Sequence, residues 1–332
     1  MSGSTIRPEK ILKELDELWV NLGKQEGDGE SGAVLRACAM TLIVATEEAE
    51  DDVGETLAQL MRDHPSRAVV LRVVQGDGPK LEARVLAQCW MPFGRRQQIC
   101  CEQIEITMTR ASLADVPPVV QSLVVPDLPV ALWVRSRPLM SLPEFQVVHL
   151  LADKIILDSQ WVPDLEQQVR LIQAFRAPEH RVADLAWTRL TRWRESIAQA
   201  FDNPVNLGRL KEIDRVRIEF QGEHTPMSAY YLAGWLKHSL GRDLVFEFRH
   251  LPGGDRPRVQ SVALQGSSLD VSITVTGDRA VELHTGVCDA QTIFPRLSEY
   301  EVLREELSLL GRDPVYDAVV RVVPEFTRRT VP

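Results

Sequence analysis

The amino-acid sequence predicts an α/β (mixed α+β) protein with two domains. In the first half of the chain, amphipathic helical segments alternate with continuous apolar runs, which are typical of strands covered on both faces. In the second half, alternating apolar and polar residues are separated by glycine turns, which predicts an antiparallel meander. We expect an N-terminal α/β layer domain over residues 1–176, a linking helix over 177–204 and a smaller C-terminal α+β domain over 205–332.

The elements of the N-terminal domain follow from apolar periodicity. The expected helices are 8–24, 51–62, 113–123 and 163–175, with a helical turn near Phe145. The expected strands are 35–45, 68–74, 81–90, 98–108, 130–134 and 154–157. The polar turn at 92–96 predicts that strands 81–90 and 98–108 pair antiparallel. Residues 27–32 (Gly-Asp-Gly-Glu-Ser-Gly) indicate a flexible linker.

The C-terminal domain shows a change of pattern. Apolar residues alternate at Val216, Ile218 and Phe220, and again at Leu244, Phe246 and Phe248. Between these two strands, Thr225 as N-cap and Pro226 as the first helical residue predict a helix that ends at Gly241. The expected meander comprises 259–264, 269–275 and 280–284, and helices follow it.

Composition limits the function classes. The chain has 332 residues and a formal net charge of −9, which argues against a general nucleic-acid binder. No apolar run is long enough for a membrane span, and the first residues lack the apolar core of a secretory signal. Five cysteines without a C-x-x-C motif suit reduced thiols in a cytoplasm.

The segment Asp184–Arg194 is the most informative, because it combines two tryptophans with three arginines. Asp184 is the predicted N-cap of a helix. Its apolar stripe comprises Ala186, Leu190, Trp193, Ile197 and Phe201. Trp187, Arg189, Arg192 and Arg194 flank that stripe. Tryptophan and arginine often carry binding energy at protein interfaces, so these four residues are candidate partner-binding residues. The alternative is a core helix with a solvated basic flank.

A second aromatic pair, Tyr231 and Trp235, lies on the helix that follows Pro226. The expected core stripe of this helix comprises Ala229, Leu232, Ala233, Leu236 and Leu240. The aromatic pair lies off this stripe. Either a second layer covers the pair, or it forms an exposed patch that binds a partner.

Residues His64-Pro65-Ser66-Arg67 form a candidate phosphate site, to which Arg135 could contribute. An imidazole, a hydroxyl and a guanidinium lie close together there, between a helix and a buried strand. The alternative is a plain helix stop, in which proline ends the helix and the histidine binds the last carbonyls.

Adjacent Cys100 and Cys101 lie on an expected strand. Successive strand residues point to opposite faces, so a disulfide between these two is disfavoured and we expect structural thiols. A redox switch requires that one of them meets Cys38, Cys89 or Cys288 in space. We therefore expect redox state to matter little.

Catalytic and cofactor motifs are missing from the sequence. Residues 27–32 match the glycine spacing G-x-G-x-x-G, but they follow an expected helix and precede an expected strand, which is the reverse of the dinucleotide-binding context. The sequence contains no P-loop, no H-E-x-x-H and no zinc-type cysteine or histidine spacing. The seven histidines are scattered and none lies in a nucleophile motif. We therefore expect no cofactor, no metal and no catalytic residues.

Five short motifs occur in the order found in one known family. They are Arg36-Ala-Cys-Ala-Met-Thr-Leu-Ile-Val44, His64-Pro-Ser-Arg67, Asp127-Leu-Pro-Val-Ala-Leu-Trp-Val134, Asp184-Leu-Ala-Trp-Thr-Arg-Leu-Thr-Arg-Trp-Arg194 and Leu232-Ala-Gly-Trp-Leu236. Together they extend from the first expected strand to the helix that carries Tyr231 and Trp235. In this respect the sequence resembles OpcA, the glucose-6-phosphate dehydrogenase assembly protein family of cyanobacteria and actinobacteria.

The resemblance implies a non-catalytic protein that binds glucose-6-phosphate dehydrogenase and promotes its active form, an allosteric activator in the oxidative pentose phosphate pathway. In cyanobacteria the family is tied to thioredoxin-dependent redox control, but no cysteine here matches a family redox cysteine. The alternative is a sugar-phosphate-binding protein or enzyme that uses His64, Ser66 and Arg67.

Overall fold

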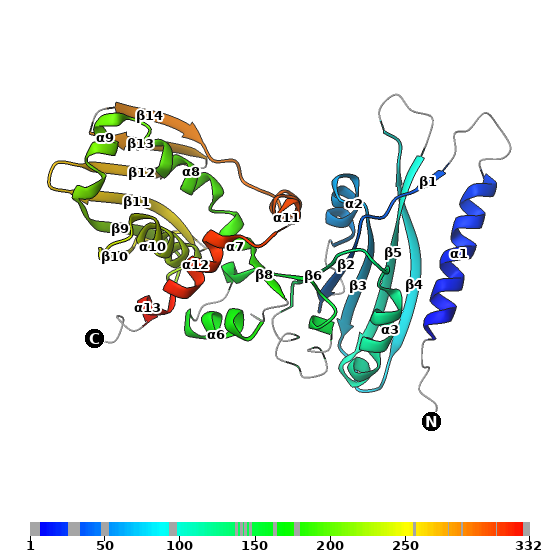
Figure 1. The fold of residues 1–332 in the computed structure, drawn as a ribbon. Coiled ribbons are helices and arrows are strands. Elements are labelled where there is room, and N and C mark those ends of the chain that lie inside the picture. The colour runs from blue at the N-terminus through cyan, green and yellow to red at the C-terminus, as the bar shows by residue number, and fades with distance from the viewer. Residues whose placement is uncertain are drawn as a thin grey trace. The chain divides into compact units, whose positions relative to one another are not determined.

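Figure 1 shows the computed structural model of the chain, which forms two compact units. Unit 1 comprises Met1–Leu157 and Phe175–Ala183, and unit 2 comprises Asp158–Ala174 and Asp184–Pro332. The residues that the structure describes are 7–25, 34–47, 53–92, 98–136, 139, 142, 145, 148–161, 165–175, 180–254, 257–277, 279–286, 288–309 and 311–327. The expected linker at 27–32 and most of the turn at 92–96 lie outside them.

Unit 1 is built on an eight-stranded sheet. Its strands are β1 (Val34–Arg36), β2 (Met40–Thr46), β3 (Ser66–Val74), β4 (Leu81–Trp90), β5 (Gln98–Thr109), β6 (Val130–Val134), β7 (Lys154–Leu157) and β8 (Arg181–Asp184). Their order is β1-β5-β3-β2-β6-β7-β8, with β4 paired to β5. The predicted antiparallel pairing of β4 and β5 is confirmed, whereas β1, β2, β3, β5, β6 and β7 pair in parallel.

Helices of unit 1 lie close to the segments that periodicity predicts. They are α1 (Pro8–Gln25), α2 (Val53–Asp63), a 3-10 turn at Arg110–Asp115 and α3 (Val116–Leu123). Helix α1 packs against β4 and α3 and buries Ile11 and Leu15. Around Phe145, only part of the predicted helical turn belongs to the described residues.

Unit 2 contains a six-stranded sheet in the order β10-β9-β11-β12-β13-β14. The strands are β9 (Ile213–Gln221), β10 (Val245–His250), β11 (Arg258–Gly266), β12 (Asp270–Thr276), β13 (Ala280–Thr285) and β14 (Cys288–Ile293). Strands β9 and β10 are parallel, because helix α10 connects them, and the other pairs are antiparallel. The predicted meander is therefore confirmed, with β14 as an additional edge strand.

Unit 2 also contains helices and 3-10 turns. They are the 3-10 turn η2 (Ser159–Trp161), α6 (Leu165–Phe175), α7 (Leu185–Thr188), α8 (Thr191–Gln199), α9 (Pro204–Gly208), the 3-10 turn η3 (Leu210–Glu212), α10 (Met227–Leu240), α11 (Glu299–Ser308), α12 (Pro314–Val322) and α13 (Pro324–Thr327). Helix α10 packs against β9, β11 and α12. It ends at Gly241 with a φ of 61°, as the sequence predicts. At its start Pro226 is the N-cap, so the prediction of Thr225 in that role is wrong by one residue.

Two predicted elements are divided in the structure. The apolar run at 35–45 forms two strands, because β1 pairs with β5 while β2 pairs with β3 and β6. The predicted helix after Asp184 is interrupted between α7 and α8 at Arg189 and Leu190. The amide of Leu190 bonds to the carbonyl of Trp187, a tighter turn than that of an α-helix.

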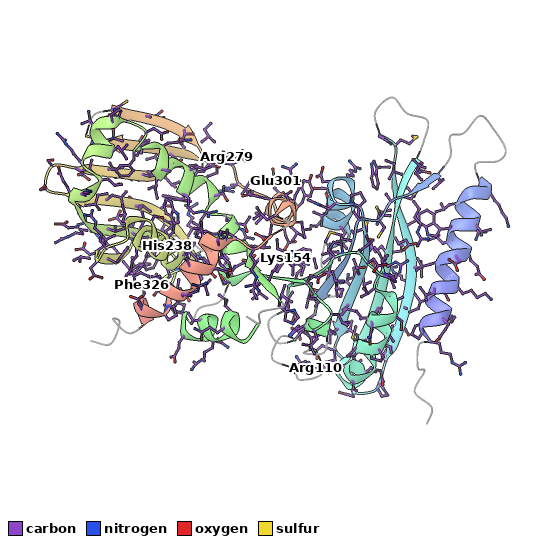
Figure 2. The ribbon with its side chains drawn as sticks, viewed as in Figure 1. Arg110, Lys154, His238, Arg279, Glu301 and Phe326 are labelled. Atoms are coloured by element: carbon purple, nitrogen blue, oxygen red, sulfur yellow. A yellow bond between two sulfur atoms is a disulfide. The ribbon has the colours of Figure 1, made fainter. Side chains whose placement is uncertain are left out.

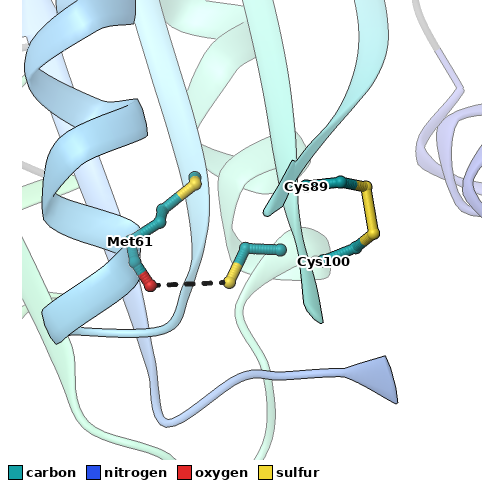
Figure 3. The surroundings of a disulfide bond; sticks show 4 residues. Met61, Cys89 and Cys100 are labelled. Carbon is teal, nitrogen blue, oxygen red and sulfur yellow. Dashed lines mark hydrogen bonds between the residues drawn. A yellow bond between two sulfur atoms is a disulfide. The ribbon is translucent and has the colours of Figure 1, made fainter. Parts of the chain in front are cut away.

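The cysteines correct one expectation. Cys89 and Cys100 face each other across β4 and β5 and form a disulfide, with an S–S distance of 2.04 Å (Figure 3). The prediction of reduced thiols is therefore wrong for this pair. Cys101 points to the other side of β5 and stays a buried thiol, and burial raises its pKa to about 11. As predicted, Cys100 and Cys101 do not bond to each other.

Candidate functional site

The candidate site is centred on Asp184 at the start of α7. Asp184 is fully buried and accepts hydrogen bonds from the amides of Ala186 (2.9 Å) and Ser159 (3.0 Å). The hydroxyl of Tyr231 donates a third bond to its other oxygen, at 2.7 Å. Burial raises the pKa of Asp184, with the charge of Asp158 as a second cause, while the donors oppose this shift. The predicted N-cap is thus confirmed, and it also anchors α10 through Tyr231.

Trp187 lies inside the protein, with 3% of its surface exposed. Its indole nitrogen donates to Asp313 Oδ2 at 2.8 Å. Its ring centroid lies 6.0 Å from that of Tyr231 and 5.7 Å from that of Tyr316. The guanidinium of Arg194 lies over the indole, 3.7 Å from the ring centroid. We call the set Asp184, Trp187, Arg194, Tyr231, Tyr316 and Asp313 the Trp187 cluster.

Two threonines connect this cluster to α11. Thr188 Oγ1 donates to the carboxylate of Glu306 at 2.6 Å, and both residues are buried. Thr191 Oγ1 donates to Glu305 at 2.7 Å. Together with Asp313, which caps α12 through the amides of Val315 and Tyr316, these bonds join α7 and α8 to the C-terminal helices.

The three arginines of the segment have different environments. Arg189 makes a bidentate pair with Asp158, with both distances 2.8 Å. The side chain of Arg194 is largely buried, and this desolvation lowers its pKa despite the nearby carboxylates of Asp313 and Glu305. Arg192 points outward, with 61% of its side chain exposed, and pairs with Glu195 at 2.9 Å. Arg192 is therefore the arginine of this segment that is best placed to reach another protein.

The two residues of the second predicted aromatic pair, Tyr231 and Trp235, have different environments. Tyr231 is fully buried under Trp187 and Tyr316, so a second layer covers this part of α10. Trp235 is half-buried. The core stripe of the helix is as predicted, apart from the half-buried Leu240.

The predicted phosphate residues lie in unit 1, and one of their two arginines, Arg67, has internal partners. Arg67 is buried and donates to Glu102 Oε2 at 2.6 Å and to the carbonyl of Leu123 at 3.0 Å. Ser66 is buried, and His64 is half-buried. The guanidinium of Arg135 lies 5.0 Å from the ring centroid of Trp133. A guanidinium bound to an internal carboxylate and carbonyl gives little capacity to hold an anion.

Sequence reasoning missed a buried ionic cluster in unit 1. Glu102, 3% exposed, accepts hydrogen bonds from Trp19 Nε1 and Arg67 Nε at 2.6 Å each, and Arg36 lies 2.6 Å away. These residues come from α1, β1, β3 and β5. Their sequence separation leaves no motif, although a glutamate inside an apolar strand is itself a signal that a cationic partner is present.

The described residues contain no group of three or more side chains of the metal-ligating types placed to hold an ion. Figure 2 shows how the side chains fill both units. Within the described part of the chain, no helix combines the length and apolar character that membrane crossing needs.

The chain is thus an α/β protein of two units. The polar and aromatic side chains of the Trp187 cluster link helices of unit 2 to one another. Two family models match it: the model described as the glucose-6-phosphate dehydrogenase subunit N-terminal domain at residues 57–174, and that of the C-terminal domain at residues 180–320. Together these matches cover most of the chain. The chain therefore belongs to the OpcA family, which confirms the resemblance seen in the five motifs.

Curated relatives agree with this family. The "Putative OxPP cycle protein OpcA" of Synechocystis sp. is 32% identical over 192 residues, which are 57% of this chain and 39% of that protein. The protein of the same name from Nostoc punctiforme is 29% identical over 180 residues, or 53% of this chain and 38% of that protein. The match thus spans well under half the length of these relatives.

A solved structure with a similar arrangement is biliverdin reductase from Synechocystis sp., in complex with biliverdin and NADP+. It is 11% identical, with a TM-score of 0.46 over 88% of this chain and 96% of that chain. A likeness of this degree carries no argument about activity.

Proposed function

We propose that the chain is a non-catalytic partner that binds glucose-6-phosphate dehydrogenase and promotes its active form. One observation carries the proposal: both halves of the chain match the models described as domains of a glucose-6-phosphate dehydrogenase subunit. The OxPP cycle name of the relatives is in line with it. The sequence has no P-loop, and its G-x-G-x-x-G match at residues 27–32 follows helix α1 rather than a strand, which favours a role without chemistry of its own.

The internal partners of Arg67 weaken the alternative of a sugar-phosphate site. A phosphate there would have to displace Glu102 from a buried guanidinium, and that buried carboxylate would lose one of its two cationic partners. These contacts make a sugar-phosphate site at Arg67 unfavourable.

For partner binding, the proposal distinguishes two groups of residues. Trp187, Tyr231 and Arg194 are packed inside unit 2, and their role is to hold α7, α10 and α12 together. Arg192 on α8 offers an exposed cation, and Arg189 and the half-buried Trp235 lie nearer the surface than the cluster. Exposed arginine suits an acidic protein surface.

The test is steady-state NADP reduction by the dehydrogenase of the same organism, with and without the purified chain, together with the mass of the mixture in solution. We expect no turnover by the chain alone, a higher rate with it and a complex of defined mass. Turnover of a sugar phosphate by the chain alone that disappears with His64→Ala would contradict the proposal. A rate and a mass unchanged by the chain would contradict it equally.

A further inference from the structure

One face of the six-stranded sheet in unit 2 has no helix packed on it among the elements of that unit that the structure describes. Helix α10 contacts β9 and β11, and the apolar residues on its side, such as Val216, Ile218 and Val262, are almost fully buried. The alternate residues of each strand point the other way. We call this second surface the open face.

The strand register places small side chains in the middle of the open face. Ser261 lies opposite Thr274, and Ala263 lies opposite Ser272. Ser261 Oγ and Thr274 Oγ1 are 3.0 Å apart and hydrogen-bond to each other. Strands β11 and β12 therefore form a strip of short side chains on the open face. Another sheet can approach this strip to the distance of roughly 10 Å that sheet packing requires.

The charges of the open face are segregated on the two sides of this strip. On β9, β10 and β11 the cations dominate: they are Arg215, Arg217, Arg249 and Arg258. The two glutamates on that side are neutralised, because Glu247 pairs with Arg215 and Arg217 at 3.1 Å and Glu219 pairs with Arg249 at 3.5 Å.

The opposite side of the strip is acidic. Asp270 on β12, Glu282 on β13 and Asp289 on β14 lie on the same face by register, and all three residues are exposed. Asp289 pairs with His284 at 2.5 Å, but Asp270 and Glu282 have no cationic partner among the ion pairs of the described residues. The open face is therefore positive on one side and negative on the other.

We propose that the open face packs against the same face of a second copy of this chain. A two-fold axis parallel to the strands and above β11 and β12 sets the positive side of one copy against the negative side of the other. Such a contact is self-complementary and closed, as in most homodimers. This inference goes beyond the proposed activation of the dehydrogenase and does not depend on it.

The size of the face is sufficient for this contact. Six strands spaced about 4.8 Å apart with about 20 Å of common length give roughly 500–600 Å² per copy, so two copies bury ~1,100 Å², which is close to the lower limit of specific interfaces. Two large apolar residues, Val245 on β10 and Ile293 on β14, lie on this face and are 55% and 67% exposed. Their burial would add to the contact.

The test is a charge-reversal pair, measured by analytical ultracentrifugation of the full chain without any dehydrogenase. The first variant carries Arg215→Glu and Arg258→Glu, and the second carries Glu282→Arg and Asp289→Arg. Each variant alone brings like charges together at both symmetric contacts, and we expect the dimer dissociation constant to rise by at least about tenfold. An equimolar mixture restores opposite charges at both contacts, so we expect heterodimers with a dissociation constant within about threefold of wild type.

Recovery in the mixture excludes misfolding as the reason for dissociation, because a misfolded variant cannot be rescued by another. A single charge reversal away from the face, Arg170→Glu on α6, is the control and should leave the dimer unchanged. A wild-type chain that stays monomeric at concentrations up to roughly the millimolar range would overturn the proposal. Variants that keep the wild-type mass but lose the dehydrogenase would overturn it too, since that enzyme would then occupy the open face.

Discussion

Individual side chains show why residue type alone assigns a role poorly in this protein. Tryptophan and arginine are enriched at interfaces, yet Trp187 and Arg194 stack on each other inside unit 2. Helical periodicity placed Trp187 at the edge of the stripe, and the layer formed by α10 and α12 covers that edge. Asp313, the partner of its indole nitrogen, lies 126 residues away, so no local pattern could have found it.

Replacement of Trp187 should therefore act on stability. Trp187→Ala removes a buried indole and should lower the free energy of unfolding by about 3–5 kcal/mol. Trp187→Phe keeps a ring but leaves Asp313 without this donor, and should cost about 1–3 kcal/mol. Urea denaturation followed by circular dichroism measures both. Half-buried Trp235→Ala is the control and should cost less than Trp187→Ala; the reverse order would show that the cluster is not the core of unit 2.

Glu102 should be essential to unit 1, because it compensates a buried cation. Glu102→Gln removes the charge opposite Arg67 and should destabilise the protein by about 3–5 kcal/mol. The control is Glu14→Gln, which breaks an exposed pair with Lys10 on α1 and should cost about 0.5 kcal/mol or less. Equal midpoints of denaturation for the two variants would contradict this reading of the cluster.

Acid should destabilise the protein through His149. Burial lowers the pKa of His149 to about 4, and the nearby His180 acts in the same direction. The neutral imidazole is favoured in the folded state, so below about pH 6.5 the unfolded chain binds a proton that the folded chain does not. The free energy of unfolding should thus be unaffected above that pH and should fall as the pH decreases toward 4, by up to about 3 kcal/mol.

One variant tests whether His149 causes this pH dependence of the free energy of unfolding. In His149→Gln the loss of stability between pH 6.5 and pH 4 should shrink, whereas replacement of the exposed His238 by Gln should leave the curve unchanged. Denaturation midpoints at several pH values provide the measurement. A wild-type curve that is flat over this interval would mean that His149 is accessible to protons in the folded state.

At the scale of elements, the sequence predicted what depends on local pattern and missed what depends on pairing. Strands β6 and β7 have the predicted ends, because β6 is a continuous apolar run buried on both faces and β7 is a buried apolar run after the half-buried Lys154. Strand β14 was not predicted, since all its residues are exposed and no apolar alternation marks it. The Cys89–Cys100 disulfide requires the register of β4 against β5, which the pattern of either strand alone does not contain.

Helix packing in unit 2 gives a prediction at this scale. A Cβ added to Gly234 on α10 would lie 3.1 Å from Val319 Cγ1 and 3.5 Å from Val323 Cγ2 on the neighbouring segment. Gly234→Leu should therefore push α10 and α12 apart and cost about 1–3 kcal/mol or more, although leucine is the better helix former. Gly23 on α1 has no atom within 4 Å of its added Cβ, so Gly23→Ala should instead stabilise by up to about 1 kcal/mol. Melting curves of both variants test the sign of each effect.

At the scale of the whole molecule, the family match and the internal packing indicate different roles for residues of the segment Asp184–Arg194. The match of both units to domains described as parts of a dehydrogenase subunit predicts a protein partner. We assign the Trp187 cluster to the stability of unit 2, and we assign a contribution to dehydrogenase binding to the exposed side of α8. Arg192→Glu should then weaken dehydrogenase binding by about 2 kcal/mol or more, roughly 30-fold, because an exposed cation at a hot spot is reversed.

The matched control for Arg192 is Arg170 on α6. Both belong to unit 2, both are about two-thirds exposed, and each pairs with a glutamate of its own helix: Arg192 with Glu195 and Arg170 with Glu166. Both reversals should leave the melting temperature close to that of the wild type, since surface pairs of this kind contribute little. If Arg170→Glu and Arg192→Glu lower dehydrogenase affinity equally, the effect is one of net charge. If neither lowers it while the wild type binds, α8 is scaffold throughout, and the surface around Trp235 becomes the next region to vary.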